Sequence, residues 1–74
     1  MHDYDHDPST YKIIEIVGTS TISWEDAAQN AVTQAAKSLR DLRIVRVVEM
    51  DAKIENGKIV LYRTRVKISF KFEN

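Results

Sequence analysis

Residues 61–72, LYRTRVKISFKF, alternate between two kinds of side chain along their whole length. The even positions are mostly apolar: Tyr62, Thr64, Val66, Ile68, Phe70 and Phe72. The odd positions after Leu61 are mostly cationic: Arg63, Arg65, Lys67, Ser69 and Lys71. A period of two is typical of an extended strand with one buried face. We therefore predict a strand that presents its even positions to a core and its odd positions as a cationic face.

A second β-rich run, RIVRVVEMDAKI, precedes this strand and is joined to it through ENGK. Asn-Gly between two such runs predicts a hairpin with a two-residue turn. If Glu55 lies opposite Lys58, the pairs Met50–Arg63, Val48–Arg65, Arg46–Lys67 and Ile44–Ser69 follow by counting outward. The opposite face of the hairpin is then continuously apolar, with Val45, Val47, Tyr62, Val66, Ile68 and Phe70.

The first half of the chain predicts one strand and one helix. YKIIEIVG, residues 11–18, is β-rich and ends in glycine. Ser23 then provides an N-cap, with Glu25 and Asp26 in the first turn. Apolar residues recur at spacings of three and four from Trp24 to Leu42, which predicts a helix of about five turns, with Trp24 as a packing anchor and with two cations in its last turns, Lys37 and Arg40. The fold class is α+β, in the order β-α-β-β: a three-stranded antiparallel sheet with one helix across it.

Length and composition limit what this fold can be. The chain has 74 residues and no cysteine, and so short a chain buries only about 60% of the surface that it exposes when unfolded. Good packing or self-association must supply the remaining stability. Residues 1–10 contain both histidines and predict a flexible tail, and 11–74 form the domain. Without an apolar run of membrane-spanning length or a signal peptide, we expect a cytoplasmic protein with no membrane partner.

The cationic face predicts self-association. In the register above it interleaves Ile44, Val48 and Met50 with four cations: Arg46, Arg63, Arg65 and Lys67. The single predicted helix packs on the other face, so nothing in one chain covers this one. Apolar residues mixed with arginine are typical of subunit interfaces and ligand pockets. We expect other copies of the chain to cover it.

Four features of the sequence resemble the dodecins, small βαββ proteins. They are YKIIEIVGTS, the N-capped helix, the R-x-L at the end of that helix and YRTRVKISFKFE, and the resemblance extends over residues 11–73. It implies a hollow homododecamer with its helices outside and its sheets turned inward. It also implies the storage or buffering of flavins rather than catalysis.

Two positions depart from the flavin-binding members of that family. The tryptophan that stacks on the flavin ring corresponds to Ile44, and a glutamine that hydrogen-bonds the ring corresponds to Arg63. Isoleucine offers no aromatic stacking, and arginine only donates hydrogen bonds. The segments GTSTISWEDAA and RIVRVVE are similar to the calcium dodecin branch, which lacks the tryptophan.

Two kinds of ligand are therefore compatible with the sequence besides a flavin. Arg46, Arg63, Arg65 and Lys67, with Met50 nearby, could hold the phosphate groups of an anionic cofactor. They could equally pair with carboxylates of neighbouring subunits. Calcium requires six to eight oxygen ligands, so a calcium site would have to be assembled from several subunits, and the candidate ligands are Glu15, Glu49 and Asp51.

Other functional classes fit less well. A nucleic-acid-binding sheet displays exposed aromatic residues, whereas Tyr62, Phe70 and Phe72 fall on the predicted core face, and the net charge is zero. An enzyme is disfavoured because the sequence has no cysteine, no Ser–His–acid set and no glycine-rich phosphate loop. We expect a non-enzymatic homododecameric shell that stores a small ligand or ion, with calcium or an anionic cofactor favoured over tightly bound flavin. The alternatives are a flavin-storage dodecin and a nucleic-acid-binding module.

Overall fold

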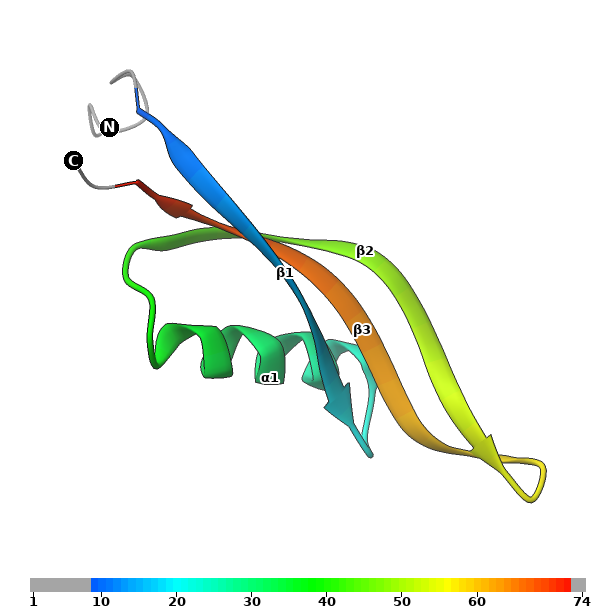
Figure 1. The fold of residues 1–74 in the computed structure, drawn as a ribbon. Helices are drawn as coiled ribbons and strands as arrows, with labels where there is room; N and C mark the ends of the chain where they lie inside the picture. The colour runs from blue at the N-terminus through cyan, green and yellow to red at the C-terminus, as the bar shows by residue number, and fades with distance from the viewer. Residues whose placement is uncertain (1–8, 73–74) are drawn as a thin grey trace.

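The computed structural model describes residues 9–72, which form one sheet and one helix. The elements are β1 (Tyr11–Ser20), α1 (Trp24–Ala36), β2 (Leu42–Glu55) and β3 (Lys58–Lys71). The sheet is antiparallel throughout, with β3 in the centre and the order β1-β3-β2 (Figure 1). This confirms the predicted β-α-β-β order. Of the predicted tail, residues 1–10, all but Ser9 and Thr10 lie outside the described residues.

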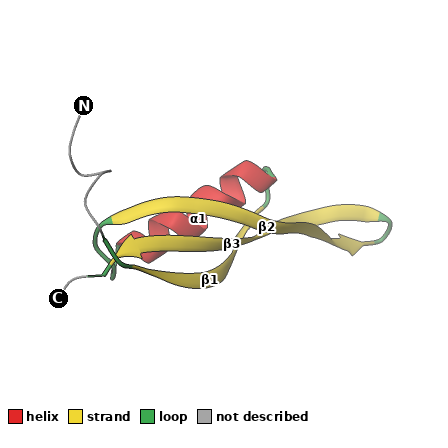
Figure 2. Ribbon diagram, turned by 90° about the horizontal axis from the view of Figure 1, so that it is seen from above, coloured by secondary structure: helices red, strands yellow, loops and turns green. Residues whose placement is uncertain are grey.

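The helix α1 lies across one face of the sheet (Figure 2). Its predicted start is confirmed, because the Ser23 side chain accepts a 2.9 Å hydrogen bond from the amide of Asp26. Gly18 allows the close approach of α1 to β1, since a Cβ at that position would overlap the carbonyl oxygen of Ala27. The helix therefore rests on the sheet through its smallest residues.

The predicted end of the helix is wrong, because α1 stops at Ala36 rather than near Leu42. The amide of Leu39 donates a 2.9 Å hydrogen bond to the carbonyl of Ala35. Asp41 has a φ of 58° where the chain reverses direction into β2. Leu39 and Leu42 still pack against the core from outside the helix, which explains why they fitted its period. No basic residue lies in the last turn of α1, because Lys37 is the C-cap and Arg40 follows it.

The predicted hairpin turn is confirmed. Asn56 and Gly57 both have positive φ, 53° and 75°, as a turn of this type requires. Glu55 pairs with Lys58. The β2–β3 hairpin projects beyond the end of β1 and beyond the helix (Figure 1), and the chain is accordingly elongated, 52 × 23 × 16 Å.

The predicted hairpin register holds only in part. Arg46–Lys67 and Ile44–Ser69 are paired as expected, but register shifts between Lys53 and Ile54 and between Val47 and Glu49 move the intervening part of β2 by one residue. The real pairs there are Met50–Thr64, Glu49–Arg65 and Asp51–Arg63. A one-residue shift turns side chains to the opposite face, so Met50 lies on the helix side, and the two acidic residues lie opposite arginines.

The hydrophobic core of one chain is very small. Among the described residues, the buried hydrophobic ones are Ala27, Ala31, Ala35, Val66 and Ile68. The large hydrophobic residues that remain exposed are far more numerous: Tyr11, Ile13, Val17, Ile22, Ile44, Val45, Val47, Val48, Met50, Ile54, Ile59, Val60 and Phe72. Most of the large hydrophobic side chains among residues 9–72 are therefore not fully buried in one copy.

Candidate ligand-binding face

The face of the sheet opposite α1 carries most of the charged side chains of the strands. We call it the open face, because no described element covers it (Figure 2). It is formed by alternate residues of all three strands: Ile13, Glu15 and Val17 of β1; Ile44, Arg46, Glu49 and Asp51 of β2; and Arg63, Arg65, Lys67 and Ser69 of β3. The cations of β3 that the sequence predicted on one face, Arg63, Arg65 and Lys67, lie along the middle of this surface.

Two arginines of the open face are held by carboxylates of the same chain. Arg63 donates from Nε and Nη2 to the two oxygens of Asp51, both at 2.7 Å. Arg65 lies between Glu15, at 3.5 Å, and Glu49, at 3.4 Å. From the sequence, these arginines could hold phosphate groups or pair with carboxylates of neighbouring subunits. In the structure they contact carboxylates of the same chain.

These contacts perturb two ionisation equilibria. The hydrogen bonds from Arg63, together with its positive charge, hold the pKa of Asp51 below its ordinary value of 3.8. In turn, the hydrogen bond to Asp51 raises the pKa of Arg63. Both side chains are therefore fully charged at neutral pH.

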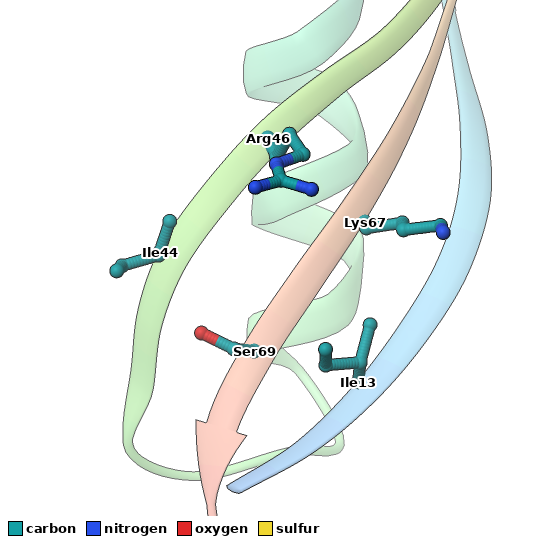
Figure 3. Close-up of a pocket in the computed structure, with 5 residues that line it drawn as sticks. All are labelled: Ile13, Ile44, Arg46, Lys67 and Ser69. Carbon is teal, nitrogen blue, oxygen red and sulfur yellow. The ribbon is translucent and has the colours of Figure 1, made fainter.

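In the other half of the open face, the cations have no such partners among residues 9–72. Arg46 and Lys67 are direct neighbours across β2 and β3. With Ile13, Ile44 and Ser69 they line a shallow hollow of about 190 Å³ that opens to solvent (Figure 3). Ile44, Arg46, Lys67 and Ser69 were all placed on this face from the sequence. Ile13 was not, because the pairing of β1 with β3 was not predicted.

Ile44 and Arg63, the two positions that the family resemblance matches to flavin contacts, both lie on the open face. Ile44 is opposite Ser69, and Arg63 lies six positions earlier on β3, which is about 20 Å in an extended strand. One chain therefore does not bring Ile44 and Arg63 together. Met50 does not accompany them, because it lies on the helix side of the sheet.

The three candidate calcium ligands share the open face but do not form a site within one chain. Glu15 and Glu49 contact Arg65, and Asp51 contacts Arg63. Within residues 9–72, no group of three or more His, Cys, Asp or Glu side chains could hold a metal ion. A calcium site at these residues would need carboxylates from more than one chain.

An apolar groove lies beside the helix, where the sequence predicted a covered surface. The helix packs on β1 and β3, which leaves Val45 and Val47 of β2 44% and 49% exposed. The groove has a volume of about 240 Å³ and includes Met50 and Trp24. The predicted anchoring role of Trp24 is confirmed by two contacts. Its Nε1 donates a 2.8 Å hydrogen bond to the carbonyl of Asp51, and its ring packs edge-on against Tyr62 with 4.8 Å between the ring centroids.

Comparisons of sequence and of structure with known proteins both match this chain to one family. Residues 10–73 match the Dodecin family. The calcium dodecin of Mycobacterium tuberculosis is 44% identical over 63 residues, which cover 85% of this chain and 89% of that protein. A crystal structure of the calcium-chelating calcium dodecin from the same organism has a TM-score of 0.78 at 43% identity, covering 88% of this chain and 93% of that one. The structure of dodecin from Streptomyces coelicolor has a TM-score of 0.86 at 35% identity, covering 89% of this chain and 94% of that one. Among residues 9–72, no helix is long and apolar enough to cross a membrane.

Proposed function

Because this chain belongs to the dodecin family, we propose that it forms a closed homododecamer that stores or buffers a small anionic ligand or calcium. Members of the family are small binding or storage proteins that self-assemble. For this chain, we propose the dodecameric state, the class of ligand, the absence of catalysis and a cytoplasmic location.

The small hydrophobic core of one chain supports self-assembly. Three alanines, one valine and one isoleucine are the buried hydrophobic residues of the described chain. A chain of this length without disulfides needs further burial to be stable. The groove beside α1, with Trp24, Val45 and Val47, is an apolar surface that a neighbouring copy would cover.

The open face is the proposed ligand-binding surface. In the arrangement that the family resemblance implies, with helices outside and sheets inside, this face would line the interior. Arg46 and Lys67 favour an anionic ligand there. Calcium is the second candidate, supported by the calcium dodecin relative and by the exposed carboxylates of Glu15, Glu49 and Asp51.

Tight flavin binding is the less favoured alternative. Ile44 lacks the aromatic surface for stacking on the ring. Arg63 has its guanidinium held by Asp51 through two short hydrogen bonds, so it is not available to the ring edge. A nucleic-acid partner is also disfavoured, because Tyr62 packs against Trp24 on the helix side and is not presented for stacking on bases.

The test measures the particle mass and the bound ligands of one preparation. Light scattering should give the mass of a dodecamer, and mass spectrometry should identify any compound that copurifies. Calorimetric titrations with calcium chloride and with sodium phosphate should show binding in at least one arm. Riboflavin should keep most of its fluorescence, and filter binding at low salt should retain no RNA. A monomer, or an assembled particle that binds neither calcium nor phosphate, would contradict the proposal.

A further inference from the structure

A second hollow lies at the end of the sheet where β1 begins and β3 ends (Figure 1). The two strand ends are joined there, because the amide of Phe72 donates a 2.8 Å hydrogen bond to the carbonyl of Thr10. The hollow, of about 360 Å³, lies between these strand ends and the residues that follow α1. We call it the terminal hollow. Its lining includes two cations, a hydroxyl and three apolar side chains: Lys12, Arg40, Ser38, Leu39, Phe70 and Phe72.

The terminal hollow is separate from the open face. Phe70 follows Ser69 on β3, so the two side chains lie on opposite faces of the sheet. Lys12 is paired with Phe70 across β1 and β3 and therefore lies on the same side as Phe70. A ligand in the terminal hollow would not compete with a ligand on the open face.

The two cations of the terminal hollow have no carboxylate partner among residues 9–72. Neither the side chain of Lys12 nor that of Arg40 forms an ion pair there. Asp41 is adjacent to Arg40 in the sequence, but its carboxylate lies 3.8 Å from the guanidinium of Arg43. An anionic group in the hollow would therefore meet two positive charges that the described chain does not neutralise.

The apolar part of the terminal hollow is only partly covered. Phe72 is 41% exposed, and Lys12 lies over its ring, with Nζ 5.3 Å from the ring centroid. Leu39 and Phe70 are half-buried. Two aromatic rings and an aliphatic side chain form a surface on which a further aromatic ring can pack. The hollow thus suits a segment that carries both carboxylates and an aromatic side chain.

The sequence that precedes the hollow has this composition. Residues 1–7, MHDYDHD, contain three aspartates and one tyrosine, and no lysine or arginine. Asp7 is three residues from Thr10 and Asp3 is seven, and such lengths of extended chain span at most about 11 and 25 Å. Because Thr10 is bonded to Phe72 of the lining, residues 1–7 are tethered beside the hollow. Tethering gives an effective concentration on the order of millimolar, so that even weak contacts would fill the hollow.

We propose that residues 1–7 of this chain bind in the terminal hollow, with their aspartates on Lys12 and Arg40 and the ring of Tyr4 against the two phenylalanines. The opposite charges of the two surfaces and the short connection between them favour this occupant. Once bound, the segment covers Phe72 and closes the hollow to other acidic ligands. This contact goes beyond the proposed storage function and depends neither on the stored ligand nor on the number of chains in the particle.

Carbodiimide cross-linking of the full-length Arg40→Lys variant tests the contact directly. The substitution keeps the positive charge and supplies an amine, which carbodiimide joins to a carboxylate in contact with it. After digestion, mass spectrometry should find the introduced lysine linked to an aspartate of residues 1–7. Lys58, at the hairpin turn, is the matched control and should give almost no such product. Sodium chloride at about 1 M should lower the yield from the introduced lysine, because it screens the attraction between exposed charges.

A peptide titration tests the charges. Asp3→Asn, Asp5→Asn and Asp7→Asn together should free the hollow, so that a fluorescein-labelled peptide MHDYDHD binds this triple variant in a fluorescence anisotropy titration. The unmodified protein should bind the peptide roughly tenfold more weakly, because its own segment competes. In the triple variant, Arg40→Gln should weaken peptide binding roughly two- to fivefold, and Lys58→Gln should leave it unchanged.

The outcomes decide between the possible occupants. The cross-linked product should run as a single chain on a denaturing gel, and a two-chain product would assign the hollow to a neighbouring copy and overturn the proposal. Equal yields from the introduced lysine and from Lys58 would also overturn it. So would displacement of the peptide by sodium phosphate beyond the effect of sodium chloride at the same ionic strength, because the hollow would then bind simple anions. Light scattering on the same samples keeps the two claims apart, since a monomer with the single-chain cross-link would contradict the shell and support this contact.

Discussion

Arg63 donates two 2.7 Å hydrogen bonds to the carboxylate of Asp51, which lies directly opposite it on β2. The pair exists because the register shifts on either side of residues 49–53 turn Asp51 toward the open face. At the position where flavin-binding relatives are expected to present a glutamine, this chain thus has a guanidinium that is already bound. The register of the sheet therefore affects whether Arg63 can contact a ligand.

The first prediction concerns the ionisation of Asp51. Its pKa, followed by NMR of the carboxyl carbon, should lie below 3.8 because Arg63 stabilises the charged form. A group with a lowered pKa stabilises the folded state above its ordinary pKa, and that stabilisation is lost as the pH falls through the lowered value. The contribution of this pair should therefore be constant near neutrality, begin to fall below about pH 4, and be lost once the pH is under the lowered pKa of Asp51.

Arg63→Gln tests the cause of that shift. It should raise the pKa of Asp51, whereas Arg43→Gln, which removes a cation near the start of β2, should leave it unchanged. An Asp51 pKa that does not respond to the loss of Arg63 would show that the ion pair is absent in solution.

The second prediction is that Ile44→Trp together with Arg63→Gln creates flavin binding in the assembled protein. Tryptophan supplies the stacking surface, and glutamine supplies a donor and an acceptor. Since the two positions are about 20 Å apart in one chain, the gain requires that they meet across a subunit contact. Titration with riboflavin should show strong quenching by the double variant and little by either single variant. A double variant that assembles normally and leaves riboflavin fluorescent would show that the open face has no flavin-shaped pocket.

The third prediction concerns the contact between α1 and β1. Gly18→Ala should destabilise the protein by about 3 kcal/mol, because the added Cβ would overlap the carbonyl oxygen of Ala27 and lie 2.9 Å from the Cβ of Ala31. The comparison is Gly57→Ala, where nothing lies within 4 Å and only the positive φ imposes a cost of about 1 kcal/mol. Thermal unfolding at one protein concentration should rank them in this order, and equal melting temperatures would mean that the helix is not so close to β1.

The fourth prediction tests the groove beside the helix as a subunit contact. Met50 is 57% exposed and lines the groove, so Met50→Glu should be tolerated by one chain but should dissociate the particle, because assembly would bury an unpaired carboxylate. Thr33→Glu introduces the same charge on an exposed part of α1 and should leave assembly unchanged. Sedimentation of both variants provides the measurement, and an intact Met50→Glu particle would show that the groove faces solvent.

The fold was predictable from local signals, and the site only in part. The Ser23 cap, the Asn56-Gly57 turn and the alternation of β3 each depend on a few neighbouring residues. The two register shifts on either side of residues 49–53 do not, because Ile59 and Val60 are both apolar, as are Val47 and Val48, and the sequence does not indicate which residue of each pair is left unpaired. That ambiguity placed Met50 on the wrong face and hid the contacts of Glu49 and Asp51 with the arginines. The hollow was missed for a related reason, since Ile13 joins it only through the pairing of β1 with β3.

The mass of the native particle at micromolar concentration decides whether this chain assembles into a closed shell. We expect a particle of twelve chains of 8.5 kDa each, and a melting temperature that rises with protein concentration because assembly stabilises the chain. A stable, folded monomer of 8.5 kDa that melts at the same temperature at every concentration would contradict it.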